Sequence, residues 1–76
     1  MPLFHFNSRT GETTLPDVEG EDLPDIAAAR TVAMNTAREA LLEAVKFGDT
    51  PPDQIQVTDG EGQEVMIIAL SEVLRS

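Results

Sequence analysis

The sequence predicts an α+β domain in which one long helix packs on a small, mostly antiparallel sheet, with the elements in the order β-β-α-β-β. Three observations support this fold class. Segments that alternate between apolar and polar residues lie near both ends of the chain, as in half-buried strands. A segment rich in alanine and leucine separates them, and glycine or proline stands at the boundaries. A chain of 76 residues has room for one core, so residues 1–76 are expected to form a single small domain.

The first strand is expected at Leu3–Asn7, where Phe4 and Phe6 point to one face by the two-residue period. Ser8–Glu12 contains a glycine and is expected to turn the chain. Thr13–Leu15 has the β-branched character of a strand, but a proline follows it, and proline cannot donate a hydrogen bond to a neighbouring strand. We therefore expect a short second strand at the edge of the sheet.

The long helix is expected at Ile26–Phe47. Asp22 is expected to cap its free amide groups, and Asp25 suits the positive end of the helix dipole. Gly48 is a natural stop, and Pro51-Pro52 prevents continuation. The apolar arc that faces the sheet is expected to carry Ile26, Ala29, Ala33, Ala37, Ala40, Leu41 and Ala44.

A hairpin is expected after the helix. Ile55–Thr58 alternates as a strand with one solvated face, and Asp59–Gly62 supplies the residues of a tight loop. Val65–Leu70 is the returning strand, and Ser71 is expected to cap a final helical turn.

The returning strand is apolar on both faces, although one helix covers only one face of a sheet. Two interpretations stay open: the last residues fold back over the second face, or that face binds a partner, most simply a second copy in a homodimer. Depending on register, the second face carries Val65, Ile67 and Ala69, or the set that we take as the candidate interface. That candidate interface consists of Met66, Ile68 and Leu70, with Leu3 beside them.

Composition and charge exclude several classes of function. The net charge of −9 argues against direct binding of nucleic acid or an anionic membrane, because both would repel the chain. No apolar run reaches the length of a membrane span, and the start does not have the pattern of a signal peptide, so a cytoplasmic location is expected. The absence of cysteine excludes disulfides and thiolate chemistry. The carboxylate-rich segments do not match a calcium-binding loop, and we expect neither a metal nor a cofactor.

Two residues are candidate functional groups. His5 is the only histidine, and a lone histidine on a strand is more often structural than catalytic. Arg30 lies inside the apolar arc of the helix, where it is expected to pair with a carboxylate of the preceding acidic segment. The candidates for this structural ion pair are Asp17, Glu19 and Asp22. The alternative for Arg30 is binding of an anionic ligand.

The sequence resembles a family of small bacterial proteins of about 75 residues that is known only as a domain of unknown function. The residues that carry the resemblance are the series Glu-Gly, Leu-Pro-Asp and Ala-Ala-Arg, here Glu19, Gly20, Leu23, Pro24, Asp25, Ala28, Ala29 and Arg30. The resemblance covers nearly the whole chain. It implies the fold and the size, and it brings no activity.

A weaker resemblance is to HicB-like antitoxin domains, on Pro16-Asp17 and Arg38-Glu39-Ala40. It implies an inhibitor of a basic toxin protein, which an acidic surface would suit. The sequence lacks the proline-glycine-cysteine turn of that family.

Three functional hypotheses follow. The first is a non-enzymatic protein-interaction module that acts as a homodimer and whose acidic surface meets a basic protein partner. The second is an antitoxin-like inhibitor of a basic partner. The third is a ligand-binding domain or enzyme that uses His5 with Arg30, which would require one deep pocket containing both.

Overall fold

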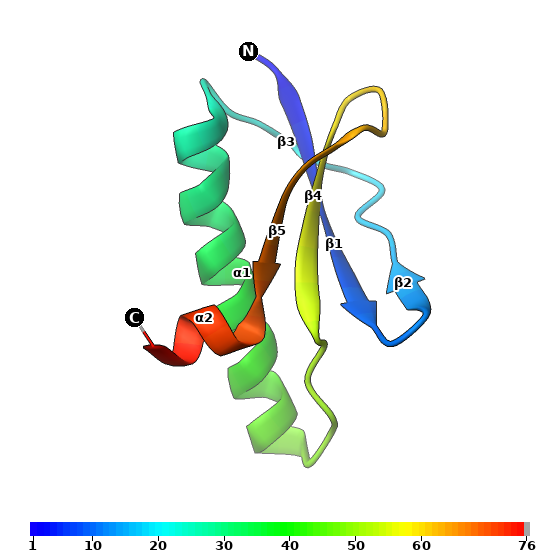
Figure 1. Ribbon diagram of the computed structural model, residues 1–76, viewed down its shortest axis with the longest axis vertical. Coiled ribbons are helices and arrows are strands. Elements are labelled where there is room, and N and C mark those ends of the chain that lie inside the picture. Colours follow the sequence, from blue (N-terminus) through cyan, green and yellow to red (C-terminus); the bar gives the residue numbers. More distant parts are fainter. Residues whose placement is uncertain (76) are drawn as a thin grey trace.

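The computed structural model describes residues 1–75, which form a five-stranded sheet with two helices packed on one face (Figure 1). The α+β class is confirmed. The molecule measures 36 × 26 × 16 Å, as expected for two thin layers. In chain order the elements are β1 (Leu3–Thr10), β2 (Thr13–Leu15), β3 (Glu21–Asp22), α1 (Ile26–Phe47), β4 (Gln54–Asp59), β5 (Glu64–Ala69) and α2 (Leu70–Arg75). Within residues 1–75, no helix is both long enough and apolar enough to cross a membrane.

The sheet has the order β2-β1-β4-β5, and every strand pair is antiparallel. The central pair is β1 with β4, so a strand that precedes α1 and a strand that follows it meet in the middle of the sheet. β1 is longer than expected, because Ser8 and Arg9 continue the pairing with β4, and the turn is confined to Gly11 and Glu12. β3 was not expected. It pairs with the start of β1 and is only two residues long. A strand this short shows no alternation of apolar and polar residues that could be detected in the sequence.

The core lies between the sheet and α1. Four core side chains point from the strands toward the helix: Phe4, Ile55, Val57 and Ile68. The buried residues of α1 are all alanines: Ala29, Ala33, Ala37 and Ala44. Alanine has no side chain beyond Cβ, so the helix lies close to the sheet. Ile26 is exposed in the first turn of α1, so the buried arc of the helix begins at Ala29 rather than at Ile26.

The candidate interface predicted from the sequence is wrong in its residues. Ile68 is 0 % exposed and Leu70 is buried beside it, because the register of β5 turns this set toward α1. Met66 is half-buried and packs against the same core. Leu3 is not their neighbour, since β4 separates β1 from β5. The C-terminal segment folds back, but onto the face that α1 already covers and not onto the second face: Val73 of α2 is buried in the same core as the alanines of α1.

The ends of α1 are set by specific residues. The carboxylate of Asp25 accepts a hydrogen bond from the amide of Ala28, 2.8 Å away, so Asp25 is the N-cap rather than Asp22, which lies in β3. Gly48 ends the helix in a left-handed conformation with φ of 71°.

Candidate functional site

The acidic segment between β2 and α1 is fastened to β1 by one carboxylate. Asp17 Oδ2 accepts a hydrogen bond from the amide of Phe6 at 3.1 Å, and Oδ1 accepts one from the amide of Gly20 at 3.2 Å. The Asp17 amide donates to the side-chain oxygen of Asn7 at 2.8 Å. The segment is therefore held by hydrogen bonds of Asp17 to the backbone of β1, and not by the expected ion pair with Arg30 of the helix.

His5 belongs to the same connection. Its Nδ1–H donates to the carbonyl oxygen of Asp17 across 2.6 Å, which fixes the hydrogen on that nitrogen. Gly20 lies against the ring: a Cβ at this position would be 2.9 Å from His5 Cε1, and φ is 71°. Only glycine fits both the conformation and the space. The contacts of His5 are those of a structural histidine.

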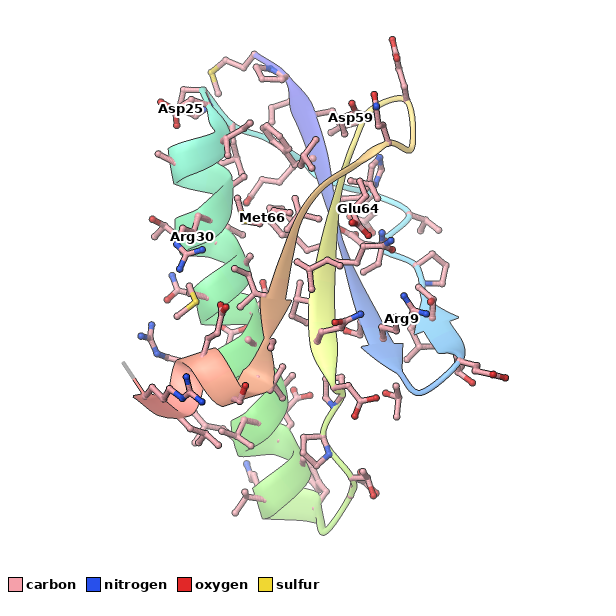
Figure 2. The ribbon with its side chains drawn as sticks, viewed as in Figure 1. Arg9, Asp25, Arg30, Asp59, Glu64 and Met66 are labelled. Atoms are coloured by element: carbon pink, nitrogen blue, oxygen red, sulfur yellow. The ribbon has the colours of Figure 1, made fainter. Side chains whose placement is uncertain are left out.

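Arg30 lies elsewhere. Its side chain is exposed on α1, and it forms no ion pair with Asp17, Glu19 or Asp22, all of which the structure describes. Arg30 and Arg9 lie on opposite sides of the molecule (Figure 2). The structure therefore does not bring Arg30 to the acidic segment. It does not bring Arg30 to His5 either, because Phe4 and Phe6 of β1 point toward α1 and His5, which stands between them, points to the opposite face of the sheet.

Two neighbouring hollows, of about 430 and 310 Å³, lie between α1 and the β1–β2 side of the sheet. They share Ser8 and Leu15, so together they form one open groove, which we call the α1–β2 groove. From α1 the groove is lined by Val32, Thr36, Ala40, Glu43, Ala44 and Phe47. These positions recur at three- and four-residue spacing and therefore form one stripe about 22 Å long, at 1.5 Å per residue.

The lining of the groove combines apolar surface with negative charge. Leu15 is 68 % exposed on its sheet side and Phe47 is 67 % exposed on its helix side, and both are large side chains that most folds bury. The charged lining residues are all carboxylates: Asp17, Glu21, Glu43 and Asp49.

A second exposed feature is the free edge of the sheet at β5. The Leu70 amide donates to the Asp53 carbonyl at 3.1 Å, so Leu70 directs its backbone groups toward β4. The backbone N–H and C=O groups of successive residues in a strand point to alternate sides. Those of Ile68 therefore also point toward β4, whereas those of Ile67 and Ala69 point outward from the edge of the sheet. Ile67 is 40 % exposed, and the edge residues 65–69 carry no charge.

Within residues 1–75, no three histidine or carboxylate side chains gather as a metal site.

The sequence matches the family described as "Domain of unknown function (DUF6894)" over residues 3–71. The chain belongs to this family. The resemblance to a small family of unknown function is thereby confirmed, and membership in DUF6894 assigns no activity. Searches of curated proteins and of solved structures found no match. The similarity to HicB-like antitoxins stays a prediction.

Sequence reasoning did not find the groove or the β5 edge. The exposure of Leu15 and Phe47 depends on how far the sheet extends beneath α1, which no local pattern records. The apolar character of β5 was visible, but which residues face outward depends on register.

Proposed function

We propose that the chain is a non-enzymatic protein-interaction module that pairs with a second copy of itself along the β5 edge. The observation that carries the proposal is an uncharged strand whose outward backbone groups have no neighbouring strand. Such an edge is a template for another strand, and natural proteins usually protect it with charge, proline or a bulge. Residues 65–69 contain neither charge nor proline. The register shift of β5 lies at Val65, so residues 66–69 continue as regular strand beyond it.

The edge is complementary to itself in an antiparallel arrangement. With the two-fold axis at Ile67, each Ile67 exchanges two hydrogen bonds with its counterpart, because its N–H and C=O both point outward. The two exposed Ile67 side chains then meet on the face of the sheet away from the helices.

The charges of this acidic chain stay outside the pairing. Glu64 is the carboxylate nearest the axis, and the two copies of Glu64 would lie about 20 Å apart, at 3.3 Å per residue. That separation exceeds the screening length of about 10 Å at 0.1 M salt. Raising the salt concentration should therefore strengthen the dimer, because it screens the remaining repulsion between two chains of charge −9.

Solution mass by light scattering across a dilution series tests the proposal. A mass near twice 8.2 kDa at high concentration, falling on dilution, is expected. Ile67→Lys should give a folded monomer, since it places two like charges at the axis. Val45→Lys is the control, because Val45 is also exposed but lies on α1.

Circular dichroism shows whether each variant is folded. A monomer in the unaltered chain at every concentration would overturn the proposal. A folded Ile67→Lys variant that keeps the dimer mass would also overturn it, since the copies would then associate elsewhere.

A further inference from the structure

We infer that the α1–β2 groove is a docking site for a basic amphipathic helix of a partner protein. This surface is separate from the β5 edge, and the inference does not depend on self-association. It names the kind of partner that the acidic exterior would meet.

The position of the groove argues for a helix as the occupant. The helical layer of the domain is complete on the side of α1 where α2 packs and incomplete on the side of β1 and β2. A helix of about 15 residues, at 1.5 Å per residue, matches the 22 Å stripe of α1 that lines the groove. It would complete a layer of helices over the sheet.

The groove offers an apolar contact to such a helix. Val32 and Ala40 lie on its α1 side, with Leu15 opposite on β2 and Phe47 near one end. A helix with apolar residues at three- and four-residue spacing would bury these side chains, which is the usual mode of helix-in-groove recognition.

Charge complementarity determines the chemistry of the partner. Glu21 lines one hollow of the groove, Glu43 and Asp49 line the other, and no lysine or arginine lines either. Lysine or arginine residues flanking the apolar stripe of the docked helix would meet these carboxylates. Such pairs increase the association rate and select basic partners over acidic ones.

The probe is a synthetic peptide of about 16 residues with leucines on one helical face and lysines on the other, a length set by the groove. Its control is a peptide of the same composition in shuffled order, which has the same charge but no apolar stripe. Titration calorimetry at low salt should show the amphipathic peptide binding at least tenfold more tightly, a difference of about 1.4 kcal/mol.

Two matched pairs of variants locate the binding. Leu15→Gln should weaken peptide binding about fivefold or more, whereas Leu42→Gln should not, although both leucines are 68 % exposed. Leu42 projects from α1 away from the sheet, about 180° from Ala33.

Glu43→Lys should weaken binding about tenfold, whereas Glu61→Lys, an identical charge change in the β4–β5 loop, should have a small effect. Binding should also weaken as salt is added.

Three results would overturn the inference. Equally tight binding of the shuffled peptide would be the first, because net charge alone would then explain the affinity. Equal losses within either pair of variants would place the binding outside the groove. A fall in the solution mass of Leu15→Gln, with no peptide present, would show that a second copy occupies the groove instead.

Discussion

The two flanks of α1 are built very differently. On one flank, which we call the closed flank, α2 folds back from β5, so that Leu70 and Val73 join Ile68 in the core. On the other flank, which we call the open flank, the sheet ends in the three-residue strand β2. There Leu15 and Phe47 are exposed to solvent beside the four carboxylates of the α1–β2 groove. The same helix therefore contributes to stability on one side and presents a surface on the other. If the groove binds a partner as we infer, stability and recognition are separated by flank in this small domain.

The largest effect is expected from the closed flank. Ile68→Ala should reduce the free energy of unfolding by about 2–5 kcal/mol, because it removes buried methyl groups and leaves a cavity. Ile67→Ala, at the neighbouring exposed position, should cost less than about 1 kcal/mol. Urea denaturation measures both, and equal losses would show that Ile67 is also buried in solution.

A smaller effect is expected from the segment that borders the open flank. Asp17→Ala should reduce the free energy of unfolding by about 2 kcal/mol, because the amides of Phe6 and Gly20 lose a charged acceptor. Glu19→Ala is the control in the same segment, where the exposed carboxylate has no such contact. Thermal unfolding compares the two variants. If they melt together, the carboxylate of Asp17 does not hold the segment.

The helix cap gives a third, weaker test. Asp25→Ala should cost about 1 kcal/mol, since the Ala28 amide loses its acceptor at the start of α1. Asp22→Ala separates the observed cap from the one that the sequence suggested. Urea midpoints decide between them, and a larger loss from Asp22→Ala would restore the sequence-based assignment.

The smallest effect is expected on the open flank. Phe47→Ala should change the free energy of unfolding by less than about 0.5 kcal/mol, because the ring is mostly in solvent, with Lys46 5.5 Å from its centre. A buried phenylalanine would cost about 3–5 kcal/mol. A loss of that size, measured by urea denaturation, would mean that the groove is closed in the free protein.

Much of the fold was predictable because its signals are local. The helix Ile26–Phe47 was located to the residue, since alanine and leucine favour it and Gly48 ends it. The alternation of Phe4 with Phe6, and of Ile55 with Val57, identified two strands and the residues that share a face in each, although Thr58 on the face expected to be solvated is buried. What sequence could not supply was the register of β5, because a strand apolar on both faces is compatible with either orientation.

The contacts that hold the loops could not be predicted from the sequence either. Asp17 and Asp53 both bond backbone amides of segments distant in the chain: Asp17 binds Phe6, and Asp53 Oδ2 accepts from Gly11 at 2.6 Å. Such bonds depend on tertiary placement and leave no periodic trace. For the same reason Arg30 was assigned a partner by charge, although it points away from the segment concerned.

The pairing of β1 with β4 at the centre of the sheet has a kinetic consequence. Arg9 pairs with Gln54, so the central ladder joins residues that lie on either side of the whole of α1. Closing the long loop between β1 and β4 lowers the chain entropy before the contacts between these strands can offset the loss. By contrast, α1 and the β4–β5 hairpin form from residues that are close in sequence. We therefore expect α1 and the hairpin to fold early, and the docking of β1 to limit the folding rate of the domain.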